Sequence, residues 1–332
     1  MTSTKQVYII PPISRENESV QFFMKWFAEA CIQFGFPVFR RWPIPRIVRS
    51  VGFRLKCGFN LSHDDKVALL FPESFYPNYD IFPYGFFYEI IPVLWDVWPE
   101  YWPSLVKSLK RNRIKTLFVT SSQVAQFVKS NFPEISCFHL LEGINIDVYM
   151  KGEALSSEKR NIDILEFGRN MHPLHEILLS MNMKNFVYQK DNKVIFPDTK
   201  SFREALSKSK VSICLPQCDT NPQRAKGVET LTQRYWECML SRTLIWGRSP
   251  KELIEFMGYD PVIPIDWSDP KRQMSDILTH IADYQSLVDR NYSFALNNAS
   301  WASRMPYIYN CLKNSGYSLP SLECRSEDKN RS

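Results

Sequence analysis

The sequence predicts an α/β protein of two domains, each built on a parallel β-sheet. Short apolar segments alternate with helical patterns along most of the chain, which is the order expected when crossover helices join parallel strands. The chain of 332 residues is also too long for one typical hydrophobic core. A polar segment, KGEALSSEKRN over 151–161, divides the alternation into two halves and is the predicted linker.

The first half contains the apolar segments expected of buried strands, separated by amphipathic helical patterns. Predicted strands cover 7–10, 37–42, 67–72, 88–95 and 116–121, and predicted helices cover 19–35, 99–112 and 122–132. Ser121 or Ser122 is a suitable N-cap for the last of these helices. These elements make up a predicted N-terminal domain over 1–150.

The same alternation restarts after the linker and predicts a C-terminal domain over 162–316. Predicted strands cover 163–168, 185–189, 211–216, 243–247 and 261–266, and predicted helices cover 172–182, 200–209, 230–241 and 251–258. From Asp269 the pattern is almost wholly helical as far as Lys313. The polar run 317–332 is predicted to be a disordered tail, because it offers too little apolar surface to bury.

Composition narrows the classes of function. Hydrophobic residues make up 44% of the chain and charged residues 23%, as in an ordinary globular protein. No run of apolar residues is long enough to span a bilayer, and the N-terminus lacks the features of a secretion signal, so we expect a cytoplasmic protein. The 8 cysteines do not show the paired spacing of a zinc site.

A basic segment, RRWPIPRIVRSVGFRLK over 40–56, interleaves cations with aromatic and aliphatic residues. Two interpretations remain open. The segment is either a solvated face beside a core or a surface that contacts an anionic membrane, such as the inner face of the plasma membrane. No DNA- or RNA-binding motif accompanies it, so nucleic acid is not an expected partner.

The candidate site follows the buried strand over 211–216, because ligands of open α/β sheets bind at the carboxyl ends of the strands. Glu229 ends the loop after this strand, and the next helix begins with residues 230–233. Unpaired N–H groups at a helix start favour phosphate, so we expect the backbone near Thr232 and Gln233 to contact one. Glu237 follows about two turns later, where its carboxylate can accept hydrogen bonds from the hydroxyls of a ribose.

Cations crowd the same place. Arg224, Lys226 and Arg234 lie in the loop and the helix start, where positive charge opposes the helix dipole unless an anion is bound. Arg169 follows the first strand of the second half, at another carboxyl edge. The pattern therefore predicts a site for an anionic ligand, with Glu229 directed toward the group that the phosphate carries.

At three places the sequence resembles the GT-B glycosyltransferases, and it is most similar to their retaining group 1, or family 4, members. The family's E-x7-E region matches VETLTQRYWECMLSRTLIWGRSPKEL, and the first strand of its C-terminal domain matches DILEFGRN. The end of its N-terminal domain resembles IIPVLWDVWPEYW, TLFVTSSQVAQFVKSNF and LLEGINIDVYMK. The resemblance implies two Rossmann-like domains facing a cleft, with C-terminal helices crossing back toward the N-terminal domain.

Carried over by position, the resemblance also implies roles for single residues. It implies Glu229 near the donor sugar hydroxyls, the amides of Thr232 and Gln233 on the diphosphate, Glu237 on the ribose, and Arg169 as a diphosphate cation. A lysine that the family usually carries after Gly-Arg is absent, and Lys226, Arg224 or Arg234 would replace it. The chain also has Thr230 and Thr232 where the family usually has glycine.

The implied activity is transfer of a sugar from a nucleoside diphosphate sugar to a hydroxyl of a glycan or lipid-linked acceptor, with retention, in surface polysaccharide biosynthesis. No metal cofactor is expected, since cations and helix amides can stabilise the leaving diphosphate and the chain contains no Asp-x-Asp. Asp96 either orients the acceptor or caps a helix. Two alternatives stay open: a sugar-nucleotide-binding protein without turnover, and a sugar-nucleotide epimerase of the same architecture.

Overall fold

The computed structural model describes most of the chain. The described residues are 5–12, 22–40, 42, 47–48, 50–51, 66–71, 81–188 and 195–321. Much of the basic segment over 40–56 and the predicted tail beyond residue 321 lie outside these residues. None of the helices within the described ranges combines the length and the hydropathy needed to cross a bilayer.

The chain divides into two compact units. The first unit comprises Met1–Gly143 and Trp301–Ser332, and the second comprises Ile144–Ser300. These limits differ from the predicted domains in three places. Residues 144–150, which the sequence assigned to the N-terminal domain, lie inside the second unit. The predicted linker over 151–161 lies inside the second unit, and residues 301–316, which the sequence assigned to the C-terminal domain, lie inside the first.

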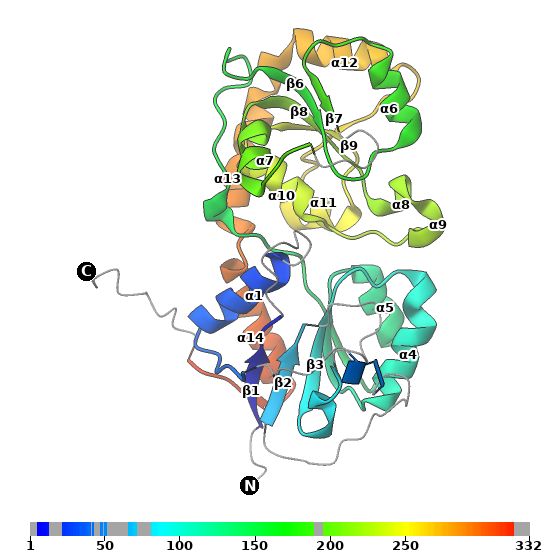
Figure 1. Ribbon diagram of the computed structural model, residues 1–332, viewed down its shortest axis with the longest axis vertical. Helices are drawn as coiled ribbons and strands as arrows, with labels where there is room; N and C mark the ends of the chain where they lie inside the picture. Colours follow the sequence, from blue (N-terminus) through cyan, green and yellow to red (C-terminus); the bar gives the residue numbers. More distant parts are fainter. Residues whose placement is uncertain are drawn as a thin grey trace, which may run out of the picture. The chain divides into compact units, whose positions relative to one another are not determined.

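The first unit is built on a parallel sheet in the order β11-β1-β2-β3-β4-β5 (Figure 1). Its strands are β1 (Lys5–Ile10), β2 (Lys66–Leu70), β3 (Glu89–Leu94), β4 (Thr116–Val119), β5 (Ser136–His139) and β11 (Tyr317–Ser318). The apolar runs of β2, β3 and β4 are almost wholly buried. This is the pattern of strands that helices cover on both faces.

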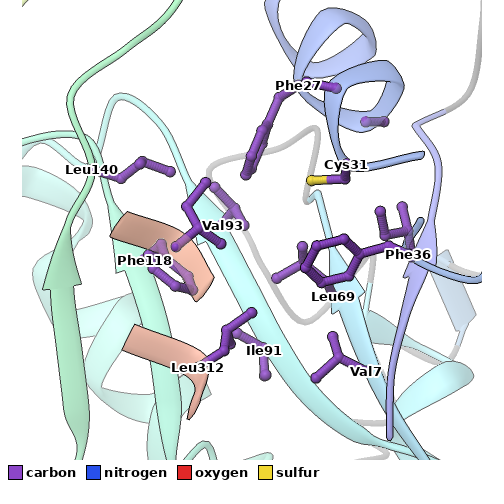
Figure 2. Packing of buried hydrophobic residues seen from close by; sticks show 14 of the residues in the cluster. Val7, Phe27, Cys31, Phe36, Leu69, Ile91, Val93, Phe118, Leu140 and Leu312 are labelled. Atoms are coloured by element: carbon purple, nitrogen blue, oxygen red, sulfur yellow. The ribbon is translucent and has the colours of Figure 1, made fainter. Parts of the chain in front are cut away.

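Helices cover this sheet and supply much of its core. They are α1 (Phe22–Gln33), α4 (Trp102–Arg111), α5 (Ser122–Asn131) and α14 (Met305–Asn314), with single turns at Tyr84–Phe86, Pro99–Tyr101 and Ala302–Arg304. Figure 2 shows Phe27 and Cys31 of α1 directed toward Leu69, Ile91 and Val93 of the strands, in a cluster that also includes Leu312 of α14. The last helix of the chain is thus part of the first unit's core.

Two predictions for the first unit are wrong. The described residues of the segment 37–42 do not form a strand, because among them only Val38 pairs with β1 and the amide of Trp42 donates instead to the Tyr84 hydroxyl at 2.9 Å. Tyr317 does not begin a tail, because it starts β11 and is buried. Its hydroxyl donates to the carboxylate of Glu89 at 2.7 Å and lies 3.0 Å from the Thr116 hydroxyl.

Replacing Glu89 with glutamine is expected to lower the free energy of unfolding by about 2 kcal/mol at neutral pH, as for a hydrogen bond to a charged group. Burial by itself would raise the pKa of Glu89, but the hydrogen bonds from Lys5 and Tyr317 outweigh burial and lower it. A carboxyl whose folded pKa is depressed stabilises the fold above its unfolded pKa. The contribution is therefore lost as the pH falls below the ordinary value of 4.5.

Urea unfolding at neutral pH and at acidic pH measures this difference. The gap between the wild type and Glu89→Gln should be largest at neutral pH and should shrink in acid. Glu134→Gln, which changes an exposed glutamate of the same unit, is the control and should match the wild type at both. A gap for Glu89→Gln that grows in acid would contradict the prediction.

The second unit is a parallel five-stranded sheet in the order β10-β9-β8-β6-β7 (Figure 1). Its strands are β6 (Ile162–Glu166), β7 (Phe186–Tyr188), β8 (Ser209–Cys214), β9 (Leu244–Gly247) and β10 (Ile263–Pro264). Numbered by their order in the chain, these strands lie side by side as 2-1-3-4-5. The strand order therefore reverses between β6 and β8, and ligands of such sheets bind at the carboxyl ends of the strands at this point.

The helices of the second unit follow the predicted alternation, and the loop after β8 contains two further short ones. They are α6 (His172–Leu179), α7 (Thr199–Ser207), α8 (Gln217–Thr220), α9 (Pro222–Ala225), α10 (Gln233–Leu240), α11 (Lys251–Met257), α12 (Pro270–Thr279) and α13 (Gln285–Asn298), with single turns at Ile146–Val148 and Ile281–Tyr284. Residues of α6 and α12 form the core with one face of the sheet. On the other face, Cys238 of α10 lies 3.7 Å from Cys214 of β8.

A buried arginine explains why the polar segment 151–161 belongs to the second unit. The Arg160 guanidinium donates to the carbonyl oxygens of Ser209 at 2.5 Å, Glu153 at 2.8 Å and Arg242 at 2.7 Å. A side chain at Gly152 would meet this guanidinium at 2.3 Å, so glycine is needed there. The polar composition predicted a free linker, but these hydrogen bonds attach the segment to the sheet.

Candidate functional site

The candidate site lies in the second unit at the carboxyl edge of β6 and β8. The loop after β6 contains Gly168 and Arg169, and the chain after β8 runs through α8 and α9 to the start of α10. Every predicted site residue except Asp96 lies in these segments or on α10. The structure therefore gathers the predicted donor-binding residues along one sheet edge, at the place where the strand order reverses.

Helix α10 begins at Gln233, three residues later than predicted. Thr232 is its N-cap and has extended backbone, with φ −101° and ψ 158°. The delay has a physical cause: the buried carboxylate of Glu252 accepts a hydrogen bond from the Leu231 amide at 2.5 Å and holds that residue outside the helix. The first N–H groups of the helix, where the sequence predicts phosphate contacts at Thr232 and Gln233, have no carbonyl partner within the helix.

Glu237 lies within α10 and is half-buried. Its Oε1 accepts a hydrogen bond of 2.8 Å from the Tyr149 hydroxyl, and the Arg203 guanidinium lies over the Tyr149 ring at 5.2 Å. Burial raises the pKa of the Glu237 carboxyl, and the Tyr149 hydrogen bond and the charge of Arg234 offset this only in part. Tyr149 is a site residue that the sequence did not reveal, since 88 positions separate it from Glu237.

The structure brings two of the predicted cations together. Arg234 packs against the loop after β6, where its guanidinium donates to the Arg169 carbonyl at 3.3 Å and lies over the Phe167 ring at 5.8 Å. Gly168 leaves space for the Arg234 guanidinium, because an added Cβ would lie 2.6 Å from it. The φ of Gly168 is +72°, which also favours glycine. Arg169 itself is exposed. Lys226 is exposed at the end of α9, in the left-handed conformation with φ 46°.

Glu229 is held by neighbouring groups of the protein. Its Oε1 accepts from the Arg248 guanidinium at 2.6 Å, and its Oε2 accepts from the Lys251 amide at the start of α11 at 3.0 Å. Arg248 also donates to both carboxylate oxygens of Asp219, at 2.6 and 2.8 Å. These hydrogen bonds to Asp219 and Glu229 raise the pKa of Arg248. That Glu229 reaches sugar hydroxyls stays a prediction, and each of its oxygens accepts a hydrogen bond from the protein.

Arg248 follows the strand β9, and the sequence did not single it out. Gly247 explains its position, because an added Cβ there would lie 1.9 Å from the Cys214 carbonyl oxygen. Only glycine lets the end of β9 approach the end of β8 so closely. The Arg248 amide then donates to that same carbonyl at 3.0 Å, and its side chain reaches the loop after β8.

A buried carboxyl ends β6. Glu166 lies 2.5 Å from Nδ1 of His175, and burial raises the pKa of the Glu166 carboxyl although His175 and Arg234 oppose the shift. Its second oxygen, Oε1, is buried without a hydrogen-bond partner among the described residues. His175 thus links α6 to the end of β6, whereas His172 is exposed at the helix start.

Asp96 lies in the first unit, just after β3. It is exposed, with φ 50°, and its carbonyl accepts a hydrogen bond from the Trp98 amide at 2.9 Å. The alternative that Asp96 is a helix N-cap is wrong, because Trp98 caps the 3-10 turn and Tyr101 caps α4. Asp96 is exposed just after a buried strand, and its role in orienting an acceptor stays a prediction.

No family model and no curated protein matches the sequence. The chain is similar in structure to HepE from Anabaena, solved with UDP and glucose, at a TM-score of 0.59 and 11% identity, over 93% of this chain and 100% of HepE. It is also similar to sucrose-phosphate synthase from Thermosynechococcus elongatus, at a TM-score of 0.56 and 11% identity over 94% and 100% of the two chains.

A third similar structure is AviGT4, a glycosyltransferase involved in avilamycin A biosynthesis. Its TM-score is 0.53 at 11% identity, over 92% of this chain and 97% of AviGT4. At such identities the likeness concerns the fold. The predicted fold is thereby confirmed: the chain has two Rossmann-like α/β units of the kind found in GT-B glycosyltransferases.

Proposed function

We propose that this protein is a glycosyltransferase that uses a nucleoside diphosphate sugar as donor. One observation carries the proposal. Glu237, the start of α10, Arg234 and Arg169 lie along the sheet edge where the strand order reverses. A carboxylate for ribose, helix amides for phosphate and two guanidinium groups for charge are the parts that such a donor requires. HepE, which is similar in fold, has been solved with UDP and with UDP-glucose.

The reaction needs charge stabilisation at the leaving diphosphate. Fixed cations and helix amides provide it without reorganising as the charge develops. We propose that Arg169 and Arg234 take this role, with Lys226 at the end of α9 as a third cation. We therefore propose transfer without a metal cofactor. Asp96 would orient the acceptor hydroxyl, and the proposal includes retention of configuration at the transferred sugar.

The acceptor side of the proposal concerns the first unit. We propose a glycan or lipid-linked acceptor, in surface polysaccharide biosynthesis at the cytoplasmic face of the plasma membrane. The side chains of Ile47, Val48 and Val51 are exposed within the basic segment over 40–56, and apolar groups among cations favour an anionic bilayer surface. Co-sedimentation with phosphatidylglycerol vesicles tests this contact, and absence of binding at low salt would overturn it.

A two-stage experiment tests the donor. Thermal-shift measurements with UDP, GDP, ADP and their glucose or mannose conjugates should show a rise in Tm that grows with ligand concentration. Mass spectrometry of the sugar nucleotide that binds, with and without added acceptors, then separates the possible activities. Transfer to an acceptor supports the proposal. A changed free sugar nucleotide would indicate an epimerase, and binding without turnover under any condition would indicate a binding protein.

A further inference from the structure

Gln217 is a buried side chain whose polar groups are both unsatisfied. It is only 2% exposed, and neither Oε1 nor Nε2 has a hydrogen-bond partner among the described residues. A buried carboxamide that could both donate and accept is costly to leave unpaired, and native proteins seldom do so without a ligand, a water molecule or a functional role. The side chain therefore calls for a partner from outside the protein.

The position of Gln217 points to the kind of partner. It is the first residue of α8, three residues after the end of β8. Strand β8 is one of the two strands between which the strand order reverses. Gln233, at the start of α10, also has a buried Nε2 without a partner in the described structure. Two side-chain amides with unsatisfied polar atoms thus lie at the start of α8 and at the start of α10, at the two ends of the loop that contains Glu229.

Glu229 lies in the same loop but, unlike Gln217, has hydrogen-bond partners for its polar side-chain atoms. Both of its oxygens accept hydrogen bonds, from Arg248 and from the Lys251 amide. Arg248 in turn donates to Asp219 and to the sulfur of Cys218, the two residues after Gln217. The charged side chains of the loop therefore form hydrogen bonds with one another and with the backbone at Lys251. The neighbouring Gln217 carboxamide has no such partner among the described residues.

We propose that Gln217 binds the sugar of the donor, beside a loop that Glu229 holds through Arg248. A carboxamide suits this role because its oxygen accepts from one hydroxyl while its nitrogen donates to the next. The four-residue helix α8 holds this side chain just beyond the carboxyl end of β8. The inference rests on the proposed function, because the sugar must arrive on a nucleotide bound beside α10.

The test compares each nucleotide with its sugar conjugate. Isothermal titration calorimetry is run with UDP and UDP-glucose, GDP and GDP-mannose, and ADP and ADP-glucose, and the pair that the wild type binds is used for the variants. Gln217→Met, which keeps the length of the side chain and removes its polar atoms, should weaken binding of the sugar nucleotide about tenfold or more, while binding of the nucleotide stays within about twofold.

The same variant makes a second, opposite prediction for the free protein. Because the unpaired carboxamide is removed, Gln217→Met should raise the Tm without ligand by about 2 °C. Ser241→Ala is the matched control, since Ser241 is also fully buried with an unpaired hydroxyl but lies in the turn before β9, at the other edge of the sheet. It should not lower the Tm and should leave binding of both ligands unchanged.

Glu229→Gln completes the comparison. It should lower the Tm, because it weakens the ion pair with Arg248 that holds the loop. The inference is overturned if Gln217→Met retains the wild-type ratio of the affinities for the sugar nucleotide and the nucleotide. A wild type that binds none of the six ligands would instead overturn the proposed function, so the two failures are distinguishable.

Discussion

Replacing Arg160 with methionine is expected to lower the free energy of unfolding by about 3–5 kcal/mol. Arg160 is 1% exposed, and its guanidinium donates to the carbonyl oxygens of Glu153, Ser209, Ser241 and Arg242. Burial lowers the pKa of Arg160 to about 10, yet at neutral pH the group remains charged. Methionine fills much of the space but leaves several buried acceptors without a donor. Urea unfolding monitored by circular dichroism measures the loss.

Lys159→Ala provides the control for this experiment. Lys159 is the adjacent residue and pairs with Glu153 on the surface, with its side chain 76% exposed. Surface ion pairs contribute little, so the variant should unfold within about 0.5 kcal/mol of the wild type. If Arg160→Met were as stable as Lys159→Ala, the segment 151–161 would be attached to the second unit by other contacts.

Replacing Glu237 with alanine is expected to weaken binding of the nucleoside diphosphate about 100-fold. Two hydrogen bonds from ribose hydroxyls to a carboxylate contribute about 3 kcal/mol together, and each 1.4 kcal/mol is a factor of ten in affinity. The change also leaves the Tyr149 hydroxyl without its acceptor. Calorimetric titration with the nucleotide that stabilises the wild type measures the effect, and sugar transfer should fall in parallel.

Three further variants separate binding from folding in this experiment. Glu237→Gln keeps the shape of the side chain and should also bind weakly. Tyr149→Phe removes the hydroxyl that donates to Glu237 and should weaken binding of the nucleotide only about fivefold. Glu255→Ala, which changes an exposed glutamate of α11, should bind as the wild type does. Wild-type affinity in both Glu237 variants would show that the ribose is held elsewhere.

Local sequence patterns were enough to locate most of the secondary structure. The apolar runs that became β3, β4, β8 and β9 are continuous and buried, and such runs between helical patterns are recognisable one segment at a time. The segments that were mistaken are those whose conformation depends on distant residues. The chain at Trp42 bonds to Tyr84, and β11 exists because Tyr317 reaches Glu89 and Thr116.

The candidate site shows the same division. The spacing of Glu229 and Glu237 and the nearby cations were visible in the sequence, because they lie within one loop and one helix. Arg248 lies 19 positions from Glu229, and Tyr149 lies 88 positions from Glu237. Nothing in the local pattern marks either residue as a partner, since an arginine after a strand or a tyrosine in a turn is common on any surface.

By itself, then, the sequence determined the α/β class, most of the helices and strands, and the helix on which Glu237 lies, because periodicity and strand-helix alternation are local properties. The tertiary structure decided which of the predicted groups have partners. It paired Glu229 with Arg248, joined Glu237 to Tyr149, attached the apparent linker through Arg160, and left the Gln217 carboxamide without a hydrogen-bond partner in the described part of the chain. Hydrogen-bond satisfaction depends on which distant residues the fold brings within about 3 Å of one another.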